Sequence, residues 1–383
     1  MLPKVTLGPT GLSVSKLCYG TNMFGTAIDQ GQANELLDTF IGLGGNFIDT
    51  ARSYGDWVPT APKGASERAI GTWLANHSRE GLVIATKGAF ADMRSGSWAP
   101  RVNPTAIAID ISESLDHLRI DRIDLWWLHT DDPSQPVAAI IDALIAHQQA
   151  GRIRHFGASN WSPARITEAQ AYARSIRHEG FVAIQPFWGL AVPNKEAATQ
   201  QGYGAYYDEG FAALHAGGLP VIPYAGQSRG FFTKLAAGGE VKLPEHLAAM
   251  YLNDTNRRRA KAVSAIAAER GVSVNEVVLA YLTSQPHLTI PIIGAGRPEQ
   301  LTQLQIKAGA GPRNQSSAHL VCGRCCDGFC AAVTGLDFSA GLLLLLPASD
   351  RRGRTRRGHR KQDCRRKLGL LLGRVLINAQ PKC

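Results

Sequence analysis

Apolar residues form eight short runs along the first three hundred residues of this 383-residue chain, without polar alternation. Strands of this kind are buried on both faces, which is typical of a parallel sheet covered by helices. A hairpin is predicted before the first of them, at residues 5–7 and 12–15 around a Gly-Pro-Thr-Gly turn. The predicted strands are residues 16–20, 47–50, 82–86, 123–128, 155–158, 182–185, 221–224 and 290–293.

Amphipathic stretches separate these runs and predict helices. The predicted helices are residues 32–43, 67–76, 104–118, 137–150, 163–175, 209–216, 256–270 and 274–284. Strand–helix units in this number predict an α/β fold, a (β/α)8 TIM barrel, which typically takes about 250 residues. We place this single domain at residues 1–304. Residues 190–256 form a longer connection rich in Gly, Tyr and charge, and such loops usually carry specificity.

Four polar residues lie at or just beyond the ends of three successive predicted strands: Asp49, Tyr54, Lys87 and His129. Taken singly, each has an ordinary structural explanation, such as a helix cap for Asp49 or a satisfied core position for His129. The carboxyl ends of barrel strands meet at one rim, where catalytic groups collect. Together, a carboxylate, a phenol, an ammonium and an imidazole at that rim predict proton transfer at neutral pH.

The chemistry of these groups suggests a role for each. Tyr54 is the candidate general acid, and we expect Lys87 to lower the pKa of its phenol from about 10. Asp49 is expected to pair with Lys87, and His129 to donate a hydrogen bond to a substrate carbonyl. Side chains cannot supply hydride, so carbonyl reduction implies a nicotinamide cofactor. No Gly-x-Gly-x-x-Gly lies between a predicted strand and helix, so the barrel itself must hold the cofactor.

This set of residues, in this order, resembles the aldo-keto reductases, and the resemblance extends over about residues 7–303. It implies NADPH-dependent reduction of an aldehyde or ketone to an alcohol, or the reverse oxidation. No metal is required by this chemistry. The family also resembles the potassium-channel β subunits, in which a cofactor-bound barrel is a regulatory module, so a binding protein with little turnover is the alternative.

The resemblance also implies a set of cofactor ligands. Ser159, Asn160 and Gln185 match the groups that bind the nicotinamide carboxamide, and Tyr224 the ring that stacks on nicotinamide. Arg297 matches an arginine that contacts the 2'-phosphate of NADP, which favours NADPH over NADH. Ordinary turn chemistry is the alternative explanation for the Gly and Asn positions. The remaining matches are Gly20, Thr21 and Asn22 beside the ribose, Gln227 and Arg229 at the pyrophosphate, and Gly294, Gly296 and Gln300 on the adenine side.

Aromatic and apolar residues are predicted in the rim loops. They would favour carbonyl substrates with apolar bodies, although loop aromatics equally often cover the top of a barrel core. The candidate pocket residues are Met23, Trp57, Phe90, Trp161 and Trp188.

The composition changes near Leu304. Residues 305–383 contain six of the seven Cys and fifteen Lys and Arg against four Asp, a net charge of +11 that leaves −1 for residues 1–304. Cys322, Cys325, Cys326 and Cys330 have spacings that could ligate zinc or an iron–sulfur cluster. Clustered Arg could bind nucleic acid or an anionic membrane. Because Glu is absent and no period persists, we instead interpret 305–383 as a frameshifted or disordered tail replacing the family's final helix.

The nearly neutral barrel gives no reason to expect a nucleic-acid partner. The apolar runs of the tail are too short to span a bilayer, so no membrane partner is expected. A cytoplasmic location is predicted, because residues 1–304 contain only Cys18 and the N-terminus does not resemble a secretory signal. The expected partner is a small-molecule carbonyl substrate, and the sequence leaves the oligomeric state open.

Overall fold

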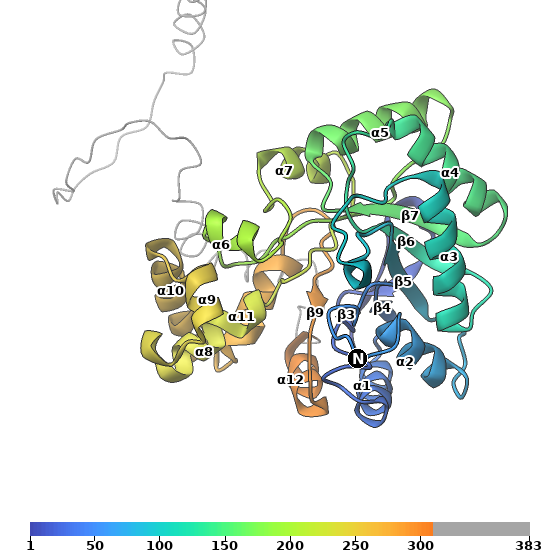
Figure 1. Ribbon diagram of the computed structural model, residues 1–383. Coiled ribbons are helices and arrows are strands. Elements are labelled where there is room, and N and C mark those ends of the chain that lie inside the picture. Colours follow the sequence, from blue (N-terminus) through green and yellow to red (C-terminus); the bar gives the residue numbers. More distant parts are fainter. Residues whose placement is uncertain (309–383) are drawn as a thin grey trace, which may run out of the picture. The chain divides into compact units, whose positions relative to one another are not determined.

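A curved parallel sheet forms the centre of the computed structural model, which describes residues 1–308 (Figure 1). Its strands lie in the order β8-β7-β6-β5-β4-β3-β9. The register pairs Asp49 with Ala85 and Lys87 with Trp127, so the predicted catalytic strand ends lie on adjacent strands. The strands are β3 (Cys18–Gly20), β4 (Phe47–Asp49), β5 (Val83–Gly88), β6 (Ile123–Leu128), β7 (Ile153–Ser159), β8 (Ile184–Gln185) and β9 (Ile292–Ile293).

Residues 221–224 close the gap between β8 and β9. Val221 forms parallel bridges with Ile184 on one side and Thr289 on the other. Its amide donates to Leu288 O at 3.0 Å, and the amide of Ile222 donates to Ile184 O at 2.8 Å. Pro223 lacks an N–H to donate, which limits this run to isolated bridges. The eight predicted strand positions are therefore all occupied, and the predicted (β/α)8 barrel is confirmed.

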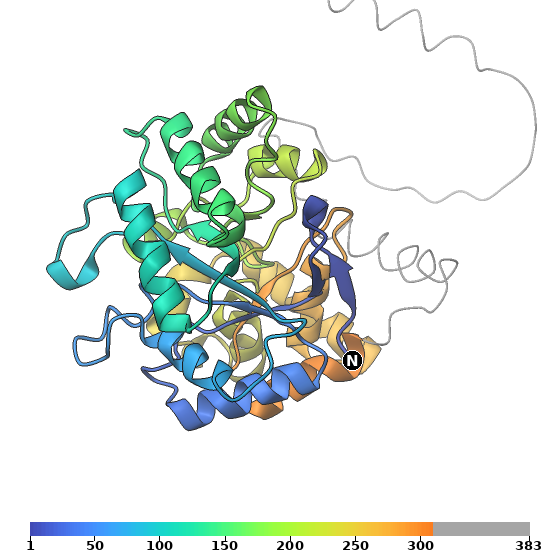
Figure 2. The ribbon, with the colours of Figure 1, turned by 90° about the vertical axis from the view of Figure 1, so that its right-hand side faces the viewer.

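Helices cover the outside of the barrel (Figure 2). Their starts follow capping chemistry: Asp29 and Gln32 form a capping box at α1, and Ser273 and Glu276 form another at α11. The helices that match predicted ones are α1 (Gln30–Gly42), α2 (Ala65–Leu74), α3 (Pro104–Leu118), α4 (Val137–Gln149), α5 (Pro163–Ser175), α7 (Glu209–Ala216), α10 (Asp254–Arg270) and α11 (Val274–Thr283).

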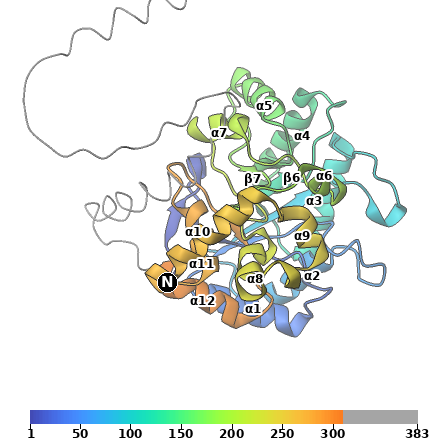
Figure 3. The ribbon, with the colours of Figure 1, turned by 90° about the vertical axis from the view of Figure 1, so that its left-hand side faces the viewer.

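Four further α-helices within residues 1–308 were not predicted: α6 (Lys195–Gln200), α8 (Phe231–Gly238), α9 (Glu245–Tyr251) and α12 (Pro298–Ala308). Three lie in the long connection, where α8 and α9 group with α10 and α11 on one side of the barrel (Figure 3). The fourth, α12, packs beside α1. It continues four residues past the predicted boundary at 304. The structure describes no residue of the predicted tail beyond Ala308.

The amino-terminal hairpin of β1 (Lys4–Thr6) and β2 (Ser13–Ser15) covers one end of the barrel. Leu7, Leu12 and Val14 are buried with Phe47 and Val83, which begin β4 and β5. The hairpin therefore closes the end where these strands begin. The opposite end, formed by the carboxyl ends of the strands, contains the predicted catalytic residues.

Candidate active site

Lys87 is the centre of the polar contacts at the carboxyl end of the barrel. Its ammonium forms an ion pair with the carboxylate of Asp49 and donates to Thr50 O at 2.8 Å and to the Tyr54 hydroxyl at 2.9 Å. The side chains of Lys87 and Asp49 are 1% and 2% exposed, so the pair is shielded from water. The structure thus brings three of the four predicted catalytic residues into direct contact.

Burial and the neighbouring charge oppose each other at both ends of this contact. Burial lowers the pKa of Lys87, but the Asp49 carboxylate and the Tyr54 oxygen raise it by more, so the ammonium stays charged. Burial raises the pKa of Tyr54 and outweighs the opposing effect of Lys87. Lys87 thus shifts the pKa of Tyr54 in the predicted direction, but the net pKa lies above its ordinary value, because the desolvation of the phenol is the larger effect.

His129 follows β6 and faces Tyr54 from across the rim. The two ring centroids are 5.8 Å apart in an edge-to-face arrangement, and the ring of Phe90 lies 4.7 Å from the imidazole. Burial, followed by the Lys87 charge, lowers the pKa of His129 well below its ordinary value. The imidazole is therefore neutral at pH 7, with one nitrogen as donor and the other as acceptor.

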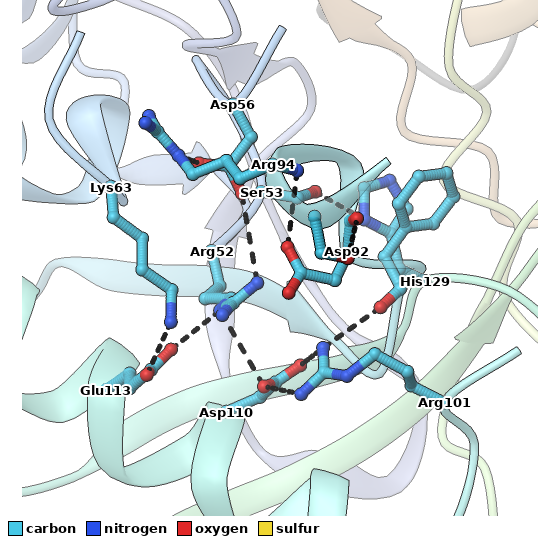
Figure 4. Close-up of polar contacts among 12 residues, drawn as sticks. Arg52, Ser53, Asp56, Lys63, Asp92, Arg94, Arg101, Asp110, Glu113 and His129 are labelled. Atoms are coloured by element: carbon cyan, nitrogen blue, oxygen red, sulfur yellow. Dashed lines mark hydrogen bonds and ion pairs between the residues drawn. The ribbon is translucent and has the colours of Figure 1, made fainter. Parts of the chain in front are cut away.

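The turn between Asp49 and Tyr54 is held by a buried group of charges (Figure 4). Arg52 donates from its backbone amide to Lys87 O at 2.9 Å and from its side chain to Glu113 at 2.7 Å. Its guanidinium also lies 3.6 Å from Asp110 on α3. Because these partners are carboxylates on another element, the turn is fixed against both β5 and α3.

The predicted carboxamide ligands lie at the ends of β7 and β8, beside the catalytic group. Gln185 donates to Asp49 at 3.0 Å, and the hydroxyl of Ser159 donates to Gln185 O at 3.0 Å. Asn160 donates to His129 O at 2.9 Å, and its side-chain oxygen accepts from Tyr224 at 2.8 Å. The nicotinamide-side residues are therefore joined to the catalytic ones by hydrogen bonds.

Tyr224 is part of an aromatic group that the sequence did not predict. Its ring is stacked on Phe187 at 5.6 Å and on Tyr203 at 6.1 Å. Its hydroxyl accepts from the amide of Gly204 at 3.2 Å. A Cβ at Gly204 would lie 2.2 Å from the Asn160 side-chain oxygen, so only glycine permits this approach.

The predicted pyrophosphate and adenine segments are joined by Gln227. Its side chain accepts from the amide of Gly294 at 2.8 Å and donates to Asn275 at 3.3 Å. Gln300 accepts from the amides of Gly296 and Arg297 at 2.8 and 3.2 Å and so orders the start of α12.

The two predicted arginine ligands and the predicted ribose-side residues differ from one another in exposure and in contacts. Arg229 has a left-handed φ of 53°, and its guanidinium lies 5.3 Å from the centre of the Tyr203 ring. Arg297 is exposed. On the ribose side, Gly20 ends β3, and Thr21 is buried and donates to Asp49 O at 3.1 Å. Asn22 is exposed.

Of the five predicted substrate-pocket residues, Phe90 is half-buried against His129, and the other four divide into two groups. Trp57 and Met23 are 45% and 39% exposed, and the ring of Trp57 lies 6.2 Å from that of Tyr54. Trp161 and Trp188 are 1% and 4% exposed and belong to the barrel core, where Trp188 stacks on Tyr207. These two tryptophans therefore lie in the core beneath the loops, and their assignment to the substrate pocket stays a prediction.

Several contacts at the site were not predicted from the sequence. Ser53 lies 3.3 Å from Nδ1 of His129, and Ser66 of α2 binds the hydroxyls of both Thr21 and Thr50. In the sequence, Ser53 lies between the predicted catalytic residues Asp49 and Tyr54. This position is the one sequence signal that could have indicated its role. Ser66 has no such signal, because its role depends on how α2 packs.

Comparison with known proteins identifies the family of the fold. The sequence profile of the Aldo/keto reductase family matches residues 16–308. The chain belongs to this family and is an NAD(P)-dependent oxidoreductase.

The individual relatives share less than a third of their residues with this chain. The chain is 31% identical to "Uncharacterized oxidoreductase YrpG" of Bacillus subtilis, covering 77% of this chain and 87% of the relative. It is 27% identical to "Aryl-alcohol dehydrogenase [NADP(+)]" of Phanerodontia chrysosporium (76% and 77%) and 27% identical to "Probable voltage-gated potassium channel subunit beta" of Oryza sativa (78% and 88%). A crystal structure of the thermostable aldo-keto reductase Tm1743 shares the fold, with a TM-score of 0.60 at 22% identity over 83% of this chain and 98% of that one.

Within residues 1–308, no cluster of three or more His, Cys, Asp or Glu side chains is arranged to hold a metal ion. None of the helices in the same range is both long enough and apolar enough to cross a membrane.

Proposed function

We propose that this protein reduces an aldehyde or ketone to an alcohol with NADPH, or catalyses the reverse oxidation. The observation that carries the proposal is the contact of 2.9 Å between the ammonium of the buried Lys87 and the Tyr54 hydroxyl. A proton donor in contact with a fixed charge, facing a neutral imidazole, is suited to protonating a carbonyl oxygen as it gains charge.

The roles follow from the geometry around Tyr54. When bound, the nicotinamide cofactor supplies the hydride to the carbonyl carbon. Tyr54 gives its proton to the carbonyl oxygen, and the raised pKa keeps the phenol protonated until then. Lys87, held by Asp49, stabilises the phenolate that remains. His129 donates a hydrogen bond to the same oxygen and orients the substrate.

The residues at the ends of β7 and β8 fit a carboxamide. The side-chain oxygen of Gln185 accepts no hydrogen bond from the described residues, although its amide nitrogen is held by Asp49. The Ser159 hydroxyl donates to Gln185 O and keeps its acceptor capacity. These two oxygens complement the two N–H groups of a carboxamide.

NADPH rather than NADH is proposed because of Arg297. The side chain is exposed just before α12, near Gly294, which has open space beside it. An arginine there is suited to a 2'-phosphate, because guanidinium binds phosphate in a bidentate manner. The name of the NADP(+)-dependent aryl-alcohol dehydrogenase relative supports the same choice.

An apolar substrate body is proposed from the rim side chains. Trp57 lies edge-to-face with Tyr54, and Phe90 lies against His129. Met23 is exposed beyond β3. Aromatic aldehydes or ketones fit such a surface. We also propose that residues 1–304 are the catalytic domain and that the protein acts in the cytoplasm, where a barrel with one cysteine is typical.

A regulatory binding module is the second candidate, favoured by the similarity to the potassium channel subunit beta. Turnover distinguishes the two candidates. The full chain is titrated with NADPH and followed by tryptophan fluorescence, and NADPH oxidation is then measured with a panel of aliphatic and aromatic aldehydes. Binding with turnover supports the reductase. Binding with negligible turnover across the panel supports the module, and the absence of NADPH binding contradicts both.

A further inference from the structure

Ser53 is a buried serine whose hydroxyl contacts the imidazole of His129 (Figure 4). The side-chain oxygen lies 3.3 Å from Nδ1, and the residue is 2% exposed. No other hydrogen-bond partner for this hydroxyl is present among the described residues. A buried hydroxyl group without an acceptor for its hydrogen is unfavourable, so the direction of this one contact matters.

The hydrogen positions follow from the acceptors within reach. Nδ1 of His129 is the only acceptor near the Ser53 hydroxyl hydrogen in the described part of the chain. If Nδ1 carried its own proton, the hydroxyl hydrogen would have no acceptor. With Nδ1 as the acceptor, the proton of the neutral imidazole is on Nε2. Nε2 has no hydrogen-bond partner in residues 1–308, so its N–H is free to donate.

Both residues of the pair are fixed in position. The backbone of the Ser53 turn is bound to β5 through Arg52, whose side chain is paired with Glu113. On the other side, Asn160 binds the carbonyl of His129, and Phe90 packs on the imidazole. Because both groups are held in place, the Ser53 hydroxyl can favour one tautomer of the His129 imidazole.

We propose that Ser53 is a positioning residue that donates to Nδ1 of His129 and so holds the imidazole in the Nε2–H tautomer, ready to donate to a substrate carbonyl. The tautomer of His129 depends only on contacts within this chain. Its effect on catalysis rests on the proposed function.

Nitrogen-15 NMR of histidine-labelled full-length protein tests the tautomer of His129 without turnover. Long-range proton–nitrogen correlations distinguish the two neutral tautomers, and a His129→Asn variant assigns the signals. We expect Nε2–H in the native protein and a shift toward mixed tautomers in Ser53→Ala, with no shift in Ser175→Ala, an exposed serine on α5. A native Nδ1–H tautomer, or an unchanged tautomer in Ser53→Ala, overturns the proposal.

Kinetics test the consequence separately. With an aldehyde that the enzyme reduces, Ser53→Ala is expected to lower kcat/KM about three- to tenfold, the effect of one hydrogen bond, while NADPH affinity stays unchanged. Ser53→Thr keeps the hydroxyl and is expected to restore most of the loss. If the protein reduces no aldehyde, the NMR experiment still determines the tautomer of His129. Failure of the proposed function can therefore be distinguished from failure of the proposed role of Ser53. A tautomer shift with unchanged kcat/KM contradicts the positioning role.

Discussion

The ammonium of Lys87, whose side chain is buried, donates a hydrogen bond to the hydroxyl oxygen of Tyr54 over 2.9 Å. This arrangement does not make the phenol acidic in the resting protein, because burial raises its pKa by more than the lysine lowers it. The contact gains strength when the proton leaves and a phenolate faces the ammonium. Lys87 therefore stabilises the charge that develops during the reaction more than the ground state.

Removing one partner of the Lys87–Asp49 pair is expected to destabilise the protein. Lys87→Met leaves a buried carboxylate without its cation, which typically costs about 3–5 kcal/mol in the free energy of unfolding. Urea unfolding followed by tryptophan fluorescence measures this. Arg257→Met, which removes the exposed pairs with Glu240 and Asp254, is the control and should destabilise the protein far less, because exposed ion pairs contribute little. Equal losses in the two variants would show that the buried pair has no special role.

Arg297→Ala is expected to weaken NADPH binding while leaving NADH binding unchanged. A hydrogen-bonded arginine–phosphate contact is typically worth about ten- to a hundredfold in affinity, and NADH lacks the 2'-phosphate. Fluorescence titration with each nucleotide gives the two dissociation constants. Arg258→Ala, an exposed arginine on α10, controls for the loss of a surface charge. A parallel loss for both nucleotides would remove the basis for NADPH preference.

Trp57→Ala is expected to raise KM for an aromatic aldehyde several-fold to about tenfold, with a smaller effect on a short aliphatic one. The reason is the loss of an aromatic contact beside Tyr54. Steady-state kinetics with benzaldehyde and propanal measure the difference. Ile176→Ala, which shortens another exposed apolar side chain, should change neither value. If both substrates respond equally to Trp57→Ala, the tryptophan does not contact the substrate body.

The free energy of unfolding is expected to fall as the pH drops below about 6.5. Burial lowers the pKa of His129, His147, His155, His178 and His215 in the folded chain. In the unfolded chain these imidazoles bind protons below about pH 6.5, so the unfolded state binds more protons than the folded one. Urea midpoints between pH 5 and 7.5 report this slope, and His129→Gln should reduce it. A midpoint at pH 5.5 equal to that at pH 7.5 would refute the prediction.

The barrel elements were predictable where apolar content and capping agreed. The predicted bounds of α3, α5, α7 and β6 match the structure. Asn103 with Pro104 marks the start of α3, Ser162 with Pro163 that of α5, and Asp208 caps α7. The helices of the long connection were missed. Helix α8 begins directly after left-handed Arg229 and Gly230 without a side-chain cap, so no start signal precedes its apolar residues.

The sequence predicted which residues lie together at the rim, but not their burial or the energies of their contacts. Strand ends placed Asp49, Lys87 and His129 on one rim, because strand order in a parallel barrel follows sequence order. The sequence does not give the depth of burial, which decides the pKa of Tyr54 and places Trp161 in the core. Nor does it show which side-chain rotamers bring Ser53 to His129.

The proton donor is the central claim, and Tyr54→Phe tests it most directly. The variant keeps the ring beside Trp57 and His129 and loses only the hydroxyl that Lys87 contacts. We expect NADPH affinity to be retained and kcat for aldehyde reduction to fall by about 10²–10⁴-fold, the usual contribution of a general acid. Tyr172→Phe, which loses a hydroxyl bound to Asp142 on an outer helix, should leave kcat unchanged. A Tyr54→Phe variant that binds NADPH and reduces the aldehyde at the native rate would contradict the account.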